Sequence, residues 1–410
     1  MIGDQRIDLR PIGRIAIVGA GKAGAGMAVA LENVLGPKLL TEKQVQGWVN
    51  VPDDCLESTQ TIKLHPARPA GVNEPTAAGV DGTQRILQLV ASLGPADLCI
   101  VLISGGGSAL LPAPIDGLAL ETKAELTREL SARGATIGQL NSVRRELSQV
   151  KAGGLARACR AGKMVALILS DVLGDDLATV ASGPTVQRSP MPQGALQVLQ
   201  DLGLADHPAG RSVVELLRSR SEQGLSEPPV AAADVTNLIL GNNALAVDAA
   251  GIEAERLGYR HAMIAAQKEE GTVDQVAQRL IGTIESMRSG TAPDCLISGG
   301  EPTVELVSPE QRGLGGRNQQ LALAVLAGID DWRQLAMLSA GTDGEDGPTD
   351  AAGAVVDGQV VETARQQGLD PADYLRRNDA YHFFEQAGGL LKTGPTNTNV
   401  CDLRVVTVEQ

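Results

Sequence analysis

The chain has 410 residues, a length at which two domains are the usual arrangement. Hydrophobic residues make up 43% of it and aromatic residues only 2%, beside 48 glycines, so its cores must consist of Val, Ile, Leu and Ala. Such cores are typical of layered α/β proteins. The formal net charge of -14 argues against nucleic acid as a partner, although a local basic cluster can still bind a small anion.

The first residues and the cysteines indicate the compartment. The chain begins with the polar stretch MIGDQRIDLR, and no apolar run approaches about 18 residues, so we expect neither a signal peptide nor a membrane span. The five cysteines form no C-x-x-C pair, and their odd number predicts reduced thiols. We therefore expect a cytoplasmic protein that is a monomer or a homodimer. Its expected partner is a small-molecule substrate, and we expect it to bind neither a membrane nor nucleic acid.

Strands and helices alternate along the first half of the chain. The predicted strands are RIAIVGAG, QGWVNVP, DLCIVLISGGG and MVALILSDV. The predicted helices are KAGAGMAVALENVL, EPTAAGVDGTQRILQLVASL, residues 122–133 and one helix in SVRRELSQVKAGGLARAC that ends near Gly162. This order predicts a Rossmann-like, doubly wound parallel sheet.

A change in composition predicts the domain boundary. Residues 219–235 are rich in Ser, Glu, Pro and Ala and have no strand pattern. We therefore predict an N-terminal domain over 1–235 and a C-terminal domain over 236–410. The second is also expected to be α/β, with a strand, turn and helix in TNLILGNNALAVDAAGIEAERLGY and strands in DCLISGGEPTVEL, LAMLSAGTDGEDG and LRVVTV.

The first glycine turn, GAGKAG, allows three interpretations. Gly19, Gly21 and Gly24 match the G-x-G-x-x-G pattern of dinucleotide-binding domains. The acids for the ribose fit the pattern poorly, because Glu42 lies in a polar run and Asp53 and Asp54 follow the second strand but come late. Lys22 adds a full positive charge to a turn that already presents N–H groups and a helix N-terminus. The turn therefore favours a phosphoryl group over NAD(P) or a plain tight turn with a surface lysine.

A second glycine turn follows the third predicted strand. Gly105, Gly106 and Gly107 allow backbone N–H groups to approach an anion, because they have no Cβ. Ser108 either caps the next helix or binds phosphate. The pattern is not that of a Walker loop.

Acidic residues follow two further strands. Asp171, with Asp175 and Asp176 behind it, follows the strand MVALILSDV. The loop GTDGEDGPTD contains four acids, namely Asp343, Glu345, Asp346 and Asp350. Carboxylates at strand ends beside phosphate loops are natural Mg²⁺ ligands, whereas the simpler interpretation is that they are turn formers.

Arg317 begins a strongly apolar predicted helix, GGRNQQLALAVLAG. A cation at a helix N-terminus is electrostatically unfavourable, so a structural role alone explains it poorly. A guanidinium matches a carboxylate or phosphate in two hydrogen bonds. This position therefore favours a functional arginine.

The combination of these segments resembles one known family. VGAGKAG, ISGGGSALL, SDVLGDDLATVASGPT, SGGEPTVEL, GGRNQQLALA, SAGTDGEDGPTDAAGA and TGPTNTNVCDL, in this order, are similar to the glycerate 2-kinases with a C-terminal MOFRL domain. The resemblance implies an ATP- and Mg²⁺-dependent kinase that converts D-glycerate to 2-phosphoglycerate. It also implies two α/β domains with the active site in the cleft between them, and it associates Lys22 and Arg317 with activity.

The resemblance leads to a hypothesis for each candidate residue. The turn of Gly105, Gly106, Gly107 and Ser108 would cradle the ATP phosphates with a second group from neighbouring turns, Gly299, Gly300, Glu301 and Thr342. Lys22 would stabilise the transferring phosphoryl group, and Arg317 would hold the glycerate carboxylate. Asp171 and Asp343 are the candidate Mg²⁺ ligands, and one of the two is the candidate proton acceptor.

Two other functions compete with this one. The G-x-G-x-x-G pattern suits an NAD(P)H-dependent hydroxypyruvate reductase, a label often given to members of the same family. A protein that senses sugars or nucleotides without turnover is the third possibility. It has little use for so many Mg²⁺-type carboxylates beside a lysine and an arginine.

Overall fold

The computed structural model describes residues 6–72, 74–188, 191–222, 233–290 and 293–409. Much of the segment predicted to end the first domain, 219–235, lies outside these residues. The chain forms two compact units. Unit 1 comprises 1–168 and 177–240, and unit 2 comprises 169–176 and 241–410. The segment 169–176, which interrupts unit 1 along the chain, thus belongs to unit 2. The sequence did not indicate this.

Unit 1 contains a six-stranded sheet in the order β3-β2-β1-β4-β5-β6. Its strands are β1 (Ile15–Ala20), β2 (Gln46–Pro52), β3 (Ile62–Arg68), β4 (Leu98–Ile103), β5 (Lys163–Leu169) and β6 (Asp234–Gly241). The strands from β3 to β5 pair in parallel. The strand order is that of the Rossmann fold, so the predicted fold class is confirmed. The sequence had not predicted β3.

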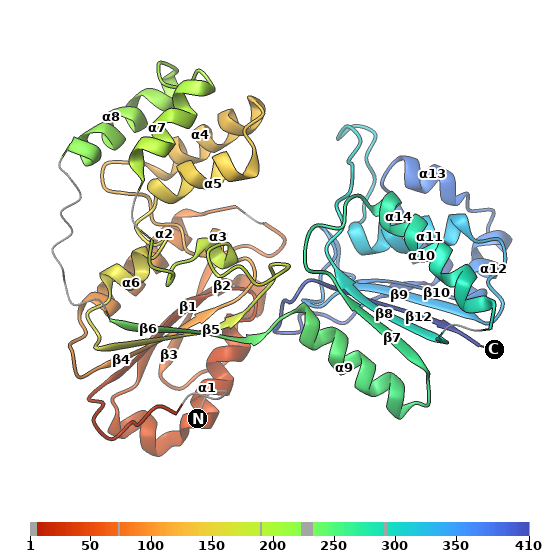
Figure 1. Ribbon diagram of the computed structural model, residues 1–410, viewed down its shortest axis with the longest axis horizontal. Helices are drawn as coiled ribbons and strands as arrows, with labels where there is room; N and C mark the ends of the chain where they lie inside the picture. Colours follow the sequence, from red (N-terminus) through yellow and green to blue (C-terminus); the bar gives the residue numbers. More distant parts are fainter. Residues whose placement is uncertain (1–5, 73, 189–190, 223–232, 291–292, 410) are drawn as a thin grey trace. The chain divides into compact units, whose positions relative to one another are not determined.

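Helices cover both faces of this sheet (Figure 1). α1 (Gly24–Glu42) packs on one face, where Ala25, Ala28 and Leu31 join strand residues such as Ile17 and Val49 in a core. α2 (Ala77–Ala91) and α6 (Gly154–Ala158) lie on the other face. All six residues of β1 and all six of β4 are buried, which is expected of central parallel strands.

Four further helices form a layer with its own apolar core (Figure 1). They are α4 (Leu120–Ala132), α5 (Ile137–Glu146), α7 (Pro192–Asp201) and α8 (Pro208–Glu222). Leu130, Leu199 and Leu217 are fully buried among them. The sequence predicted only the first of these four helices near its observed bounds.

The single helix predicted in SVRRELSQVKAGGLARAC is wrong, because the structure divides it into α5 and α6. Ala152 and Gly153 between them have φ angles of 50° and 80°, in the left-handed region that ends a right-handed helix. A Cβ on Gly153 would lie 2.7 Å from the carbonyl oxygen of Val186, so this position requires glycine. The break turns the chain inward and buries Lys151.

Unit 2 contains a mixed sheet in the order β11-β10-β9-β12-β8-β7. Its strands are β7 (His261–Ala265), β8 (Cys295–Gly300), β9 (Leu335–Gly341), β10 (Gly353–Val356), β11 (Leu390–Leu391) and β12 (Asp402–Val408). Only the pair β7–β8 is parallel, and β12 lies antiparallel between β8 and β9. The last strand in the chain therefore occupies a central place.

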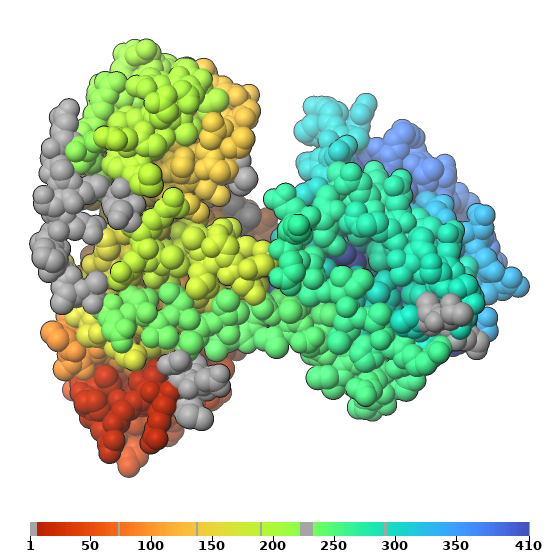
Figure 2. Space-filling model, in the orientation of Figure 1, coloured from red at the N-terminus to blue at the C-terminus, as the bar shows by residue number. Residues whose placement is uncertain are grey.

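One helix covers the first face of this sheet and several cover the second (Figure 1). α9 (Asn243–Arg256) packs on one face through Val247 and Ala254. The other face carries α10 (Val273–Arg288), α11 (Arg317–Gly328), α12 (Gly358–Gln366), α13 (Pro371–Arg376) and α14 (Ala380–Ala387). The outward side of α9, in green in Figure 2, leaves Leu245 and Ile252 exposed. No helix among the described residues is long and apolar enough to cross a membrane.

We predict that Glu32→Ala lowers the free energy of unfolding by about 3 kcal/mol, because three backbone donors, of which that of Ile62 is buried, lose their acceptor. The Glu32 carboxylate, on α1, accepts the backbone N–H groups of Gln60, Thr61 and Ile62 at 2.7, 2.7 and 2.9 Å and so fixes the start of β3. Urea unfolding measures the loss. Glu42→Ala, on an exposed position of the same helix, is the matched control, and equal losses in both variants would contradict the assignment.

Candidate active site

The glycines of the β1–α1 turn are required by packing. A Cβ on Gly19 would lie 2.1 Å from the carbonyl oxygen of Leu102 in β4. Gly21 has a φ of +146°, and its Cβ would lie 2.0 Å from the Ser104 hydroxyl, which accepts the Ala23 N–H instead. The pattern G-x-G-x-x-G therefore reports a close contact between two strand ends. It does not by itself indicate a nicotinamide cofactor.

The second glycine turn meets the first. The Lys22 N–H donates to the carbonyl oxygen of Gly105 at 2.9 Å. Gly106 has a φ of +75°, and a Cβ there would lie 3.5 Å from both the Lys22 side chain and the Arg68 guanidinium. Two cationic side chains therefore border this turn, although Arg68, at the end of β3, had not been singled out from the sequence.

Ser108 does not cap a helix. The short helix α3 (Gly107–Leu110) has Gly106 as its N-terminal cap and no side-chain cap. The Ser108 hydroxyl instead accepts from the Lys151 Nζ at 2.5 Å and lies 3.2 Å from the hydroxyl of Ser182. Gly107 makes this possible, because its Cβ would lie only 3.0 Å from Ala181 beside Ser182. The capping alternative is therefore wrong.

Lys151 belongs to a group of four basic side chains in unit 1. Burial and the neighbouring cations Arg144, Lys123 and Arg145 hold the pKa of Lys151 well below its usual value. Burial, with repulsion from Arg144, lowers the pKa of Lys123 to about 7. Among the described residues, no carboxylate lies within ion-pair distance of any of the four. In a chain with a net charge of -14, such a group creates a local positive charge that favours an anion.

In unit 2, the candidate arginine Arg317 lies in a network of ion pairs. The Nε and Nη2 of Arg317 donate to the two carboxylate oxygens of Asp402 at 2.7 and 2.9 Å. Its Nη1 donates to Glu301 at 2.7 Å. Burial alone would lower the pKa of Arg317, but Asp402 and Glu301 outweigh it and raise the value. The unfavourable helix position is thus explained by the fully buried Asp402, which the sequence analysis missed.

A second ion pair lies behind Glu301. Arg404, which is fully buried, donates to both oxygens of Glu270 at 2.9 and 2.6 Å. Glu270 in turn accepts the N–H of Glu301 at 3.0 Å. A Cβ on Gly300 would lie 1.7 Å from Glu270, and one on Gly299 would lie 1.8 Å from Asn243. Packing therefore suffices to explain both glycines, without a nucleotide.

Asp171 lies close to this network. The thiol of Cys401 donates to the Asp171 carbonyl oxygen at 3.1 Å. Burial raises the pKa of Glu301, Arg317 opposes the shift, and the charges of Asp402 and Asp171 add to it. The structure thus brings Asp171, Glu301, Asp402 and Arg317 together, with more carboxylates than cations.

The acidic residues of the loop after β9 have different roles. Asp343 accepts the Glu345 N–H at 3.1 Å, and the Thr342 hydroxyl donates to the carbonyl oxygen of Cys401 at 2.7 Å. Asp346 is 2% exposed and accepts the N–H groups of Asn318 and Gln319, so it caps α11. Among the described residues, no group of three or more His, Cys, Asp or Glu side chains is arranged as a metal site.

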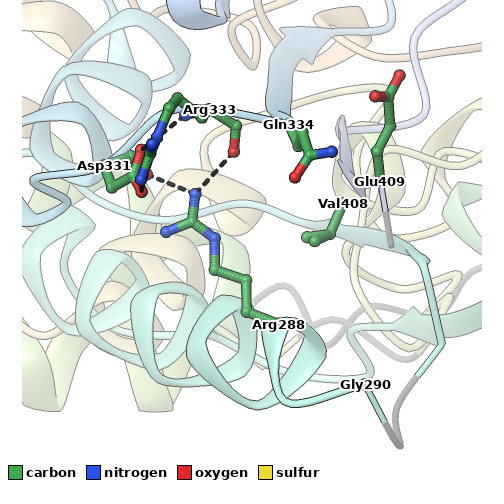
Figure 3. A pocket seen from close by; sticks show the side chains of 7 residues that line it. All are labelled: Arg288, Gly290, Asp331, Arg333, Gln334, Val408 and Glu409. Carbon is green, nitrogen blue, oxygen red and sulfur yellow. Dashed lines mark hydrogen bonds and ion pairs between the residues drawn. The ribbon is translucent and has the colours of Figure 1, made fainter.

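A surface hollow of about 760 Å³ lies elsewhere on unit 2 (Figure 3). Its arginines are engaged, since Arg333 pairs with Asp331 and Arg288 donates to the backbone of both. The hollow is also lined by Val408, at the opposite end of β12 from Asp402. A strand of this length spans about 20 Å, so the hollow is separate from the ionic network.

Comparison with known proteins adds the family. Residues 2–218 match a family model described as a domain of unknown function, DUF4147, and residues 294–402 match the MOFRL family. The chain is 39% identical to the glycerate kinase of Homo sapiens, over 99% of this chain and 86% of the human protein. It is 37% identical to the D-glycerate 2-kinase of Thermotoga maritima, over 95% and 89%.

A solved structure agrees with these matches. The crystal structure of a glycerate kinase from Thermotoga maritima superposes with a TM-score of 0.81 at 35% identity, covering 97% of this chain and 92% of that one. Fold and matches together define a two-unit α/β enzyme of the kinase class. The chain belongs to the glycerate kinase family that joins this N-terminal domain to a MOFRL domain.

The role of Asp346 as a buried cap predicts a specific pH dependence. Burial raises the pKa of Asp346 to about 6, against the N–H groups that lower it. The unfolded value is about 3.9, so between these two values the folded protein binds a proton that the unfolded chain has lost. The contribution of Asp346 to the free energy of unfolding therefore falls by about 3 kcal/mol as the pH rises through this interval.

Urea unfolding of the wild type and of Asp346→Asn at several pH values measures this contribution as the difference between the two proteins. Asp350→Asn is the control in the same loop. Hydrogen bonds from Lys392 and Tyr381 lower the pKa of Asp350, so its contribution changes in the opposite direction. The prediction would be contradicted if the difference in the free energy of unfolding between the wild type and Asp346→Asn rose with pH.

Proposed function

We propose that this enzyme transfers the γ-phosphoryl group of ATP to the 2-hydroxyl of D-glycerate, with Mg²⁺. Glycerate kinase activity follows from the similarity, over nearly the whole chain, to curated glycerate kinases. That similarity is the observation that carries the proposal. The regiochemistry, the donor and the metal are the proposed parts.

The basic side of the reaction lies in unit 1. Phosphoryl transfer needs positioning and neutralised charge more than covalent chemistry. Lys22 borders the Gly106 turn together with Arg68, and Ser108 lies in the same turn. We assign the phosphates of ATP to this turn, with Lys22 at the transferring group. Lys151 and its neighbouring cations support this assignment, because they favour an anion nearby.

The carboxylate of glycerate is assigned to Arg317. The expected two-pronged grip has to be modified, because Asp402 already holds the Nε and Nη2 of this guanidinium. The substrate is therefore assigned to the Nη1 end, where Glu301 is bound in this structure.

Mg²⁺ fits the donor set of unit 2. Asp171, Glu301 and Asp402 raise one another's energy by repulsion, which a hard divalent cation relieves, and carboxylate oxygens are its preferred ligands. Asp171 and Glu301 would hold the ion, with Asp343 as the further candidate. When bound, it neutralises charge on the phosphates. Asp171 and Asp343 both remain candidates for accepting the proton of the hydroxyl.

The reductase alternative has lost its main support in the sequence. Gly19 and Gly21 are required by contacts with Leu102 and Ser104, so the dinucleotide pattern has a packing cause. None of the five cysteines, all of which the structure describes, forms a disulfide, which supports our assignment of the reaction to the cytoplasm.

A coupled assay tests the function directly. The protein is incubated with D-glycerate, ATP and Mg²⁺, ADP release is followed, and the product is offered to enolase alone. We expect conversion by enolase, which accepts 2-phosphoglycerate. ADP release without an enolase substrate would contradict phosphorylation at the 2-hydroxyl, and NAD(P)H oxidation with hydroxypyruvate but no ADP release would favour the reductase.

Lys22→Ala is expected to lower kcat by about a hundredfold or more, because the transition state loses a cation at the transferring phosphoryl group. KM for D-glycerate should change little. Lys38→Ala, at an exposed position on α1, is the matched control. A kcat within about twofold of the wild type would remove Lys22 from its assigned role.

A further inference from the structure

Lys151 lies deeper in unit 1 than the two hydroxyls it contacts. Only 4% of it is exposed, whereas Ser108 and Ser182 are partly exposed. Its Nζ donates to the Ser108 hydroxyl at 2.5 Å and lies 3.4 Å from that of Ser182. The two hydroxyl oxygens are 3.2 Å apart. The three groups therefore form a closed polar trio whose outer side is made of hydroxyls.

Counting donors shows what the trio has to offer. An ammonium group has three donors and no acceptor, so it occupies one lone pair on each hydroxyl oxygen that it contacts. The two hydroxyls can share only one hydrogen bond with each other. When Lys151 is protonated, at least one O–H therefore has no acceptor inside the trio and is available to a bound oxygen atom.

The surrounding charge selects an anion as that ligand. Lys123 comes from α4 and donates to the carbonyl oxygen of Leu147, while Arg144 and Arg145 come from the last turn of α5. The Nε of Arg145 is buried without a hydrogen-bond partner. Burying like charges side by side costs free energy, and an oxyanion would recover part of it.

We propose that Lys151 is the positioning residue of an oxyanion site, in which it directs the hydroxyl protons of Ser108 and Ser182 toward a bound phosphate. The naming of the ligand as a phosphate of ATP rests on the proposed function. The site itself rests on the contacts of unit 1 alone.

We expect Lys151 to take up a proton when the anion binds. Burial and the neighbouring cations lower the pKa of Lys151 in the free protein, and a bound anion raises it. Affinity for the anion therefore falls as the pH rises through the interval between these two values. The charged groups that face Lys151 are Lys123, Arg144 and Arg145, of which Lys123, with a pKa of about 7, also titrates in this range.

Sulfate is the probe, because it is a tetrahedral oxyanion that does not titrate near neutral pH. Calorimetry of sulfate binding to the full chain, in two buffers of different ionisation enthalpy, counts the protons taken up. We expect uptake by the wild type. In Lys151→Met sulfate should bind about tenfold weaker or worse, with the uptake lost. Lys163→Met, near the start of β5, is the control and should behave as the wild type.

Two further variants make the result specific. Lys123→Met should keep the uptake, and Ser182→Ala should weaken sulfate binding, whereas Ser92→Ala on the surface should not. Unchanged sulfate affinity and uptake in Lys151→Met would overturn the proposal. So would uptake that persists in Lys151→Met but disappears in Lys123→Met, or a wild type that binds no sulfate.

Sulfate binding needs no turnover, so its outcome is independent of the glycerate assay. Uptake that depends on Lys151 in a protein without kinase activity would keep the oxyanion site and reject ATP as its ligand. Normal glycerate turnover with an unaltered KM for ATP in Lys151→Met would reject the site and keep the function.

Discussion

The end of β1 has no room for a methyl group, and the polar site of unit 1 depends on that restriction. A Cβ on Gly19 or Gly21 would collide with Leu102 or Ser104 in the neighbouring strand end. Because the two turns meet without side chains between them, the Lys22 N–H reaches Gly105. Close contact at Gly107 brings Ser108 beside Ser182 and Lys151 in the same way. The glycines are thus required for close packing, and that packing in turn places the polar groups.

The two units differ in the sign of their uncompensated buried charge. Unit 1 gathers cations around Lys151 with no carboxylate in ion-pair distance among the described residues, so the electrostatic cost of these charges is relieved by loss of a proton or by a bound anion. Unit 2 pairs Arg317 and Arg404 with acids and still has carboxylate charge in excess around Glu301. A phosphate suits the first environment and a divalent cation the second.

Local patterns predicted the elements that carry the first turns, and missed what distant segments contribute. β1, β4 and the start of α11 at Arg317 followed from apolar runs bounded by glycines. Lys151 was hidden inside a predicted helix, because nothing local reveals that Ala152 adopts a positive φ. Asp402 was missed because its neighbours are set by the pairing of β12 with β8 and β9. The role of Asp346 stayed open in the sequence, because a helix cap and a metal ligand are both acids in a glycine-rich loop.

The central place of β12 has a consequence for how the protein is made. β8 and β9 are joined only through β12, so a chain emerging from the ribosome cannot close the sheet of unit 2 before residue 408 has been synthesised. Asp402 is added with that strand, and until then Arg317 lacks its buried partner. Assembly of the ionic network is therefore coupled to the synthesis of β12. The glycine turns that follow β1 and β4 are synthesised well before this strand.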